Sequence, residues 1–197
     1  MSAPRVVVAE DEALIRLDLV ESLREAGYEV VGEAADGAEA VALVRSEKAD
    51  VAVLDVMMPG TDGLTAAREI MSDRLAAVVI LTAFSQRDLV EQARDAGAMA
   101  YLVKPFKSEE LVPAIELAVA RFREFDVIAS EAESLSDRLE TRKILDRAKG
   151  KLMDTYALPE QEAFRFLQQT AMSRRTSMKK IALAVLDDDL SPDSTEE

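Results

Sequence analysis

Cysteine and histidine are both absent from the 197-residue sequence. Without cysteine the chain has no disulfide framework and no thiolate metal site, which suits the cytoplasm. Without histidine it has no Ser-His-Asp or Cys-His triad, no histidine-ligated zinc site and no residue to carry a phosphohistidine. Any chemistry must therefore depend on carboxylates, lysine, threonine or tyrosine.

Long apolar runs are absent as well. No run approaches the roughly 18 residues that a membrane-spanning helix needs. The N-terminal MSAPR also lacks the apolar stretch of a signal peptide. We therefore expect a cytoplasmic protein that has no membrane partner. Hydrophobic residues still make up 49% of the chain, which is enough for a core, and the length corresponds to about one and a half domains.

The charge is unevenly distributed along the chain. The formal net charge is −14, yet residues 137–180 contain 11 Lys/Arg and 6 Asp/Glu, so this segment carries +5 and the remainder −19. A globally acidic protein with such a basic segment can still bind a polyanion through that segment. The alternative is the solvated face of a helical domain.

Residues 1–106 alternate between two patterns. Short apolar runs, typical of buried strands, occupy residues 5–10, 28–33, 51–55, 77–82 and 100–104. Helical patterns lie between them at 14–27, 37–46, 63–72 and 86–96. In the first of these, Leu14, Leu17 and Val20 are near helical spacing. This alternation predicts a doubly wound α/β fold in which helices cover both faces of a five-stranded parallel sheet.

The pattern becomes purely helical from residue 108, with no glycine before Gly150. We expect a long helix followed by a small three-helix module. The module would contain residues 137–153, a helix that starts at Pro159 and a last helix capped by Thr176 or Ser177. One side of its middle helix carries Ala163, Phe164, Leu167 and Ala171.

The long helix also contains a short heptad-like seam. Apolar residues are spaced three and four apart at Ile115, Ala118, Phe122, Phe125, Ala129 and Ala132. The alanines make this a weak seam. A coiled coil between two chains and a lone helix are both compatible with it.

Polar residues stand where the predicted strands end. Glu10 and Asp11 follow the first strand, Asp55 ends the third, Thr82 the fourth and Lys104 the fifth. Ligands of open parallel sheets bind at this edge. Each residue alone is a common feature of a strand end, so the prediction depends on their joint placement.

The predicted cluster suits phosphoryl transfer. Neighbouring carboxylates repel one another unless a cation joins them, and Mg²⁺ prefers such oxygen ligands. Asp55 would act as a nucleophile on phosphorus and form an aspartyl phosphate. Lys104 and the metal would neutralise the phosphoryl oxygens, and the Thr82 hydroxyl would donate a hydrogen bond to another of them.

Residues 5–120 resemble the receiver domain of two-component response regulators. The resemblance lies in AEDE (9–12), LDVMMPGTDG (54–63), LTAF (81–84) and YLVKPF (101–106). It implies a flavodoxin-like fold and a cis peptide between Lys104 and Pro105. It also implies Asp55 as phosphoacceptor, with Thr82, Lys104 and Tyr101 as switch residues.

The same resemblance implies a Mg²⁺ site. Its ligands would be Glu10, Asp11, Asp55 and the backbone carbonyl of Met57. Many family members have aspartate at the position of Glu10. The extra methylene should permit a water-mediated contact with the metal, and it is expected to affect metal binding or the lifetime of the phosphate.

Residues 135–190 resemble the ANTAR domain, an RNA-binding helical module of transcription antiterminators. The resemblance lies in LETRKILDRAKGKLMDTYALPEQEAF (139–164) and AMSRRTSMKKIA (171–182). The whole chain is similar to actinobacterial phosphorylation-dependent antitermination regulators, which partner a PdtaS-type sensor histidine kinase. The resemblance implies RNA hairpins with exposed loop bases as ligands.

Seven basic residues are the predicted RNA contacts: Arg138, Arg142, Lys149, Arg174, Arg175, Lys179 and Lys180. At about 100° per residue, the first three fall within a narrow arc of one helix. Basic side chains would hold phosphates, and unpaired loop bases would carry the sequence information. Tyr156 is a candidate to stack on a base, with core packing as the alternative.

These predictions divide the chain into a receiver domain (1–122), a helical linker or coiled coil (123–136), an ANTAR domain (137–190) and an acidic tail (191–197). The predicted function is a response regulator that a histidine kinase phosphorylates on Asp55. Phosphorylation would promote a homodimer and control RNA binding in transcription antitermination. No enzymatic activity is expected beyond the receiver's own phosphorylation and dephosphorylation.

Two other functions compete with this prediction. The C-terminal helices are also compatible with a helix-turn-helix, which would make the chain a DNA-binding response regulator. An aspartate-nucleophile phosphatase is the second alternative. It is disfavoured because Met57 stands two residues after Asp55, where such enzymes usually have an acid/base aspartate.

Overall fold

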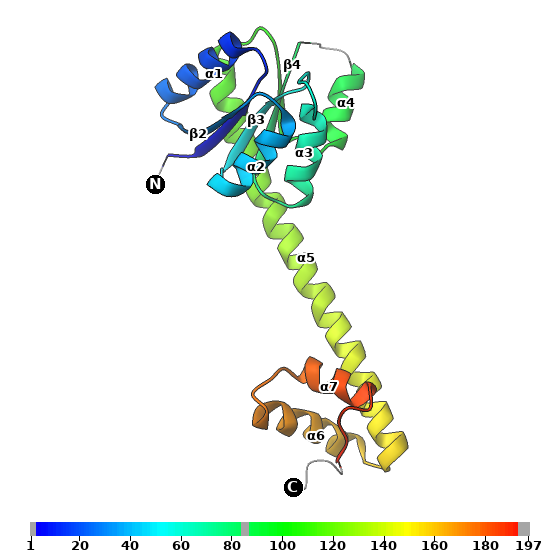
Figure 1. Cartoon of the computed structure of the whole chain (residues 1–197). Coiled ribbons are helices and arrows are strands. Elements are labelled where there is room, and N and C mark those ends of the chain that lie inside the picture. Colours follow the sequence, from blue (N-terminus) through cyan, green and yellow to red (C-terminus); the bar gives the residue numbers. More distant parts are fainter. Residues whose placement is uncertain (1–2, 84–86, 193–197) are drawn as a thin grey trace. The chain divides into compact units, whose positions relative to one another are not determined.

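The computed structural model describes residues 3–83 and 87–192, with the backbone alone at 87–89 and 108 (Figure 1). Phe84 of the LTAF motif and most of the predicted acidic tail lie outside the described residues. The chain divides into two compact units, residues 1–128 and 129–197, and each is described by itself. No helix in the described ranges is long and apolar enough to cross a membrane.

The first unit is built on a five-stranded parallel sheet with the order β2-β1-β3-β4-β5. The strands are β1 (Arg5–Ala9), β2 (Glu29–Ala34), β3 (Val51–Asp55), β4 (Ala77–Thr82) and β5 (Ala100–Val103). The helices are α1 (Ala13–Glu25), α2 (Gly37–Glu47), α3 (Gly63–Ser72), α4 (Arg87–Asp95) and the first part of α5 (Ser108–Tyr156). This confirms the predicted flavodoxin-like, doubly wound fold.

Helices cover both faces of the sheet (Figure 1). Successive strand residues point to opposite faces, so Ala52 and Leu54 join the core beneath α2, α3 and α4. Val51 and Val53 join the core beneath α1 and α5. Burial on both sides explains why β3 is apolar throughout until it ends at Asp55.

The turn after β3 is held tightly against the strand end. A Cβ at Gly63 would lie 1.9 Å from the carbonyl oxygen of Asp55, so only glycine fits there. The Asp62 side chain caps α3 by accepting a hydrogen bond from the Thr65 backbone N–H. The first turn of α3 therefore packs directly on the backbone of Asp55.

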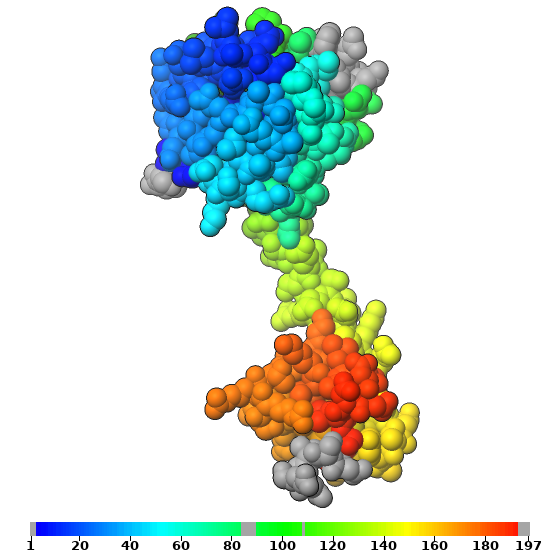
Figure 2. All heavy atoms as spheres, viewed as in Figure 1, coloured from blue at the N-terminus to red at the C-terminus, as the bar shows by residue number. Residues whose placement is uncertain are grey.

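The second unit is a small helical module formed by the end of α5, α6 (Glu160–Ser173) and α7 (Met178–Leu186). In Figure 2, α6 and α7, coloured orange and red, lie beside the yellow end of α5. The buried core consists of Ala148, Leu152, Ala163, Leu167, Ala171, Ile181, Ala182, Val185 and Leu190. Tyr156 is partly buried against this core, which favours the packing interpretation of that residue.

Two predicted helix starts in this module are confirmed. Helix α6 begins directly after Pro159, and the Ser177 side chain caps α7 by accepting a hydrogen bond from the Lys180 backbone N–H. Residue 137, where the sequence predicts the module to start, lies within helix α5. This helix is continuous over 49 residues, and Pro113 lies within its first two turns.

The predicted seam of α5 divides between two environments. Ile115 and Ala118 are buried in the core of the first unit, and Phe122 packs against it. Phe125 is 43% exposed, and Ala132 is exposed as well. The first half of the seam therefore belongs to the core of the first unit, and the coiled coil stays a prediction.

Candidate functional site

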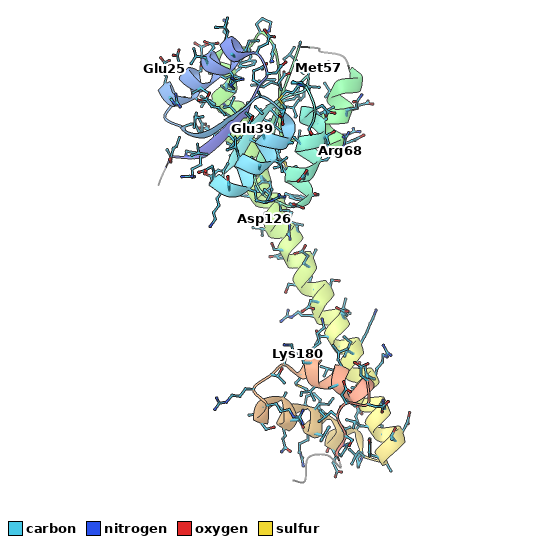
Figure 3. All side chains as sticks on the ribbon, in the orientation of Figure 1. Glu25, Glu39, Met57, Arg68, Asp126 and Lys180 are labelled. Carbon is cyan, nitrogen blue, oxygen red and sulfur yellow. The ribbon has the colours of Figure 1, made fainter. Side chains whose placement is uncertain are left out.

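The parallel sheet brings the predicted acidic cluster to one edge. Ala9 pairs with Leu54, and Asp55 with Leu81, so the ends of β1, β3 and β4 are level. Figure 3 labels Met57 at this edge. The strands thus place their terminal polar side chains at a common site.

Lys104 joins the two buried carboxylates of this site. Its Nζ lies 2.5 Å from Oε2 of Glu10 and 2.6 Å from Oδ1 of Asp55. Glu10 is 1% exposed and Asp55 is 5% exposed. The Lys104 backbone N–H also donates a hydrogen bond to the Thr82 carbonyl, at 2.7 Å, which fixes the start of the β5–α5 loop against β4.

The environment favours a charged lysine between the two acids. Burial raises the pKa of the Glu10 carboxyl; the hydrogen bond from Lys104 opposes this effect and the charge of Asp55 reinforces it. Burial lowers the pKa of the Lys104 ammonium, but its hydrogen bonds to Asp55 and Glu10 outweigh burial and the pKa rises. The ammonium group is therefore a counter-ion shared by both carboxylates.

Three acidic side chains are close enough to share one cation. Carboxylate oxygens of Glu10, Asp11 and Asp55 lie within 4.8 Å of one another. The Met57 backbone N–H donates to Oδ2 of Asp55 at 2.8 Å, which orients that carboxylate. A set of hard oxygen donors with one exposed member, Asp11, fits Mg²⁺, which usually retains water ligands. The role of the Met57 carbonyl stays a prediction.

The remaining switch candidates occupy different surroundings. Thr82 is 4% exposed at the end of β4. Tyr101 is 47% exposed on β5 and lines a groove of about 400 Å³ between α4, β5 and α5. The Lys104–Pro105 peptide bond is cis, as the resemblance implies.

The predicted RNA contacts fall into two groups. Arg138, Arg142 and Lys149 line a groove of about 320 Å³ between α5 and α6. Arg174 and Arg175 lie exposed in the turn between α6 and α7, and exposed Lys180 follows at the start of α7 (Figure 3).

Two of the lysines are already bound to carboxylates. Lys149 contacts Asp146 at 3.0 Å and Glu160 at 2.9 Å. Lys179 contacts Asp137 at 2.8 Å and Glu140 at 3.1 Å. The hydrogen bonds to these acids raise the pKa of both lysines, and a phosphate would have to compete with the acids for each ammonium group.

Several residues of these sites carry no obvious sequence signal. The Arg16 guanidinium donates to the Glu10 carbonyl at 2.5 Å and braces the β1–α1 loop. Phe164 and Arg165 line the surface around Lys149. Arg16 looks like an ordinary helical surface residue in the sequence, and helical spacing places Phe164 on the apolar side of α6.

Two family models match the chain. The response regulator receiver domain matches residues 6–116, and the ANTAR domain matches residues 133–186. The transcriptional regulatory protein PdtaR of Mycobacterium tuberculosis is 60% identical over 183 residues, which cover 93% of this chain and 89% of that protein.

Other relatives match the receiver region. The chemotaxis protein CheY of Thermotoga maritima is 38% identical over 112 residues, which cover 56% of this chain and 93% of CheY. Among solved structures, the signal receiver domain of NarL from M. tuberculosis has a TM-score of 0.59 at 37% identity. The match covers 61% of this chain and 98% of the chain in the NarL structure.

Proposed function

The chain belongs to the response regulators that join a receiver domain to an ANTAR domain, and on this premise we propose that it converts phosphorylation into RNA binding. A PdtaS-like sensor histidine kinase in the cytoplasm donates a phosphoryl group to Asp55. The ANTAR domain binds RNA hairpins and so regulates gene expression by transcription antitermination. The chain has no catalytic activity on other substrates.

The observation that carries this proposal is the position of Lys104 between Asp55 and Glu10. An Asp55 oxygen attacks the phosphorus of the kinase phosphohistidine, the P–N bond breaks, and the electron pair returns to the imidazole. The attached phosphate adds roughly −1.5 to −2 charge. Lys104 then turns from Glu10 to a phosphate oxygen, because this new charge lies within its reach.

Glu10, Asp11, Asp55 and the Met57 carbonyl would hold Mg²⁺, which neutralises charge on the phosphoryl oxygens when bound. The Thr82 hydroxyl moves to donate a hydrogen bond to the phosphate. Because Tyr101 lines the groove between α4, β5 and α5, it turns inward as Thr82 moves and reshapes that surface.

Helix α5 provides a covalent route for the signal. It contributes Leu111 and Ile115 to the receiver core and Ala148 and Leu152 to the ANTAR core. Phosphorylation promotes a homodimer through α5, which brings two ANTAR domains to paired hairpins. Light scattering should show a larger mass after phosphorylation; an unchanged mass together with unchanged RNA affinity would contradict this step.

The phosphoacceptor is tested by incubating the chain with a small-molecule phosphodonor and Mg²⁺, then separating phosphorylated protein on a phosphate-affinity gel. The wild type and Asp18→Asn, a control at an exposed α1 position, should both shift. Asp55→Ala should not. A gel shift of the Asp55→Ala protein would mean that another residue is the phosphoacceptor.

The choice between RNA and DNA is tested with two labelled probes at several salt concentrations. One is a pool of RNA hairpins with randomised loops, and the other is DNA duplex of matched stem sequence. We expect tighter binding to the hairpins. Preference for duplex DNA would support the DNA-binding alternative, and multiple turnover on small phosphate esters would support the phosphatase.

A further inference from the structure

The ANTAR domain keeps one of its aromatic side chains accessible. Phe164 is 43% exposed on α6, whereas Tyr156 and Phe166 are partly buried against the core. Helix α6 fills the core with small or aliphatic side chains from Ala163, Leu167 and Ala171. The ring of Phe164 is therefore the aromatic surface that this domain presents to a ligand.

Phe164 lies where two grooves meet. It lines the groove of about 320 Å³ together with Arg138, Arg142 and Lys149. It also lines a second groove of about 500 Å³ with Lys149 and Arg165. An exposed aromatic ring is thus bordered by basic side chains from both α5 and α6.

Acidic residues line these grooves as well, but lysines bind them. Asp137 contacts Lys179, and both Asp146 and Glu160 contact Lys149, at 2.8 to 3.0 Å. Arg138, Arg142 and Arg165 have no carboxylate partner among the residues that the structure describes. The arginines are therefore the positively charged side chains around the ring that are available to bind an anion.

We propose that Phe164 stacks on an unpaired base of bound RNA while Arg138, Arg142 and Arg165 hold the adjoining phosphates. This inference rests on the proposed RNA binding and adds the position at which a base is held. Aromatic side chains bind bases through their π-faces, which are accessible in loops and covered in a duplex. Such a site would therefore favour hairpin loops over duplex.

Affinity for the randomised-loop RNA hairpin pool tests this position. Phe164→Ala should weaken binding by about 5- to 150-fold, the range for one stacked base, whereas Phe164→Tyr should retain most of the affinity. Stacking is not ionic, so Phe164→Ala should keep the dependence of affinity on salt. Arg142→Ala should reduce the slope of log K against log[salt] by about 1.

A tryptophan reporter separates contact with RNA from a structural role. The chain contains no tryptophan, so Phe164→Trp places a single indole at the site. Leu183→Trp is the control, because Leu183 on α7 is 39% exposed and lines neither groove. RNA should quench the indole at 164 strongly and the indole at 183 little, while circular dichroism confirms that both variants are folded.

The outcomes distinguish this inference from the proposed function. If the wild type binds no RNA hairpins, both fail together. If the wild type binds and Phe164→Ala binds equally well, the inference fails and RNA binding stands. Equal quenching at positions 164 and 183 would also overturn the inference. So would a loss of affinity in Phe164→Ala together with a loss of helicity in both Phe164→Ala and Phe164→Tyr.

Discussion

Replacing Lys104 with methionine should make the receiver domain depend on a divalent cation for its stability. Methionine is an unbranched apolar side chain, so the change removes the ammonium group and retains much of the packing. It leaves Glu10 and Asp55, which are 1% and 5% exposed, facing one another without the cation that contacts both. Buried like charges are costly in this arrangement.

The size of the effect follows from the burial of the pair. Breaking a buried ion pair by removing one partner costs about 3–5 kcal/mol. The Lys104 side chain is 16% exposed, and water will enter the space, so we expect a loss of about 2–4 kcal/mol in the free energy of unfolding. Two unit charges about 4 Å apart at an effective dielectric constant near 20 give a repulsion of about 4 kcal/mol, which is consistent with this range.

Mg²⁺ should restore much of this loss. A ligand present at about 100 times its dissociation constant stabilises a folded state by about 2.7 kcal/mol. Mg²⁺ should stabilise Lys104→Met more than it stabilises the wild type, because in the wild type it competes with the Lys104 ammonium for the same carboxylates. Urea denaturation followed by circular dichroism, with and without Mg²⁺, measures both effects.

The pH dependence gives a further check on the same variant. Burial raises the pKa of Glu10 in the folded chain, so the folded state binds more protons than the unfolded state as the pH falls towards that pKa. Stability then rises with falling pH, and the deficit of Lys104→Met should shrink. In the double variant Lys104→Met/Glu10→Gln, most of this stability deficit should disappear at neutral pH.

Two results would refute this reasoning. One is a loss in Lys104→Met of less than about 1 kcal/mol without Mg²⁺, well below the cost of an uncompensated buried charge. The other is an equal gain from Mg²⁺ in the variant and the wild type. Either would mean that Lys104 is not the counter-ion of the two carboxylates.

Further predictions concern the turn after β3, helix α5 and the ANTAR core. Gly63→Ala should destabilise the receiver by more than about 3 kcal/mol, because its Cβ would lie 1.9 Å from the Asp55 oxygen. Gly150→Ala, where nothing lies within 4 Å, should stabilise α5 by about 0.5–1 kcal/mol. Leu167→Ala should destabilise the ANTAR domain by about 2–5 kcal/mol and leave Asp55 phosphorylation unchanged. Urea denaturation measures all three, and a phosphate-affinity gel checks the last.

The receiver site could be predicted because its geometry follows from topology. Parallel strands end at one edge, so the positions of Asp55, Thr82 and Lys104 at strand ends were enough to predict their convergence. The bond between Lys104 and Glu10 joins residues 94 apart in sequence. The sequence predicts that the two meet, and it does not predict that one ammonium contacts both acids.

The exposure of individual apolar side chains on a helix is harder to predict than the helical spacing of those residues. Leu14 and Leu17 follow the spacing of Val20, yet they are 83% and 51% exposed and Val20 is fully buried. Phe164 likewise shares the apolar side of α6 and stays partly exposed. Spacing defines one side of a helix, and the width of the neighbouring elements decides how much of that side is covered.

The partners of the basic residues also depend on tertiary structure. Lys149 and Lys179 were predicted to bind RNA, and their carboxylate partners include Glu160, 11 residues from Lys149, and Asp137, 42 residues from Lys179. Helical wheels of single segments do not contain such pairs. They appear only once α6 and α7 are packed against α5.

The most direct test of phosphorylation-controlled RNA binding is the affinity of the wild type and Asp55→Ala for the RNA hairpin pool, each with and without a phosphodonor and Mg²⁺. We predict that the phosphodonor and Mg²⁺ together tighten binding by the wild type and leave Asp55→Ala unchanged. Equal affinity of the wild type under both conditions, or an equal response of Asp55→Ala, would contradict the account.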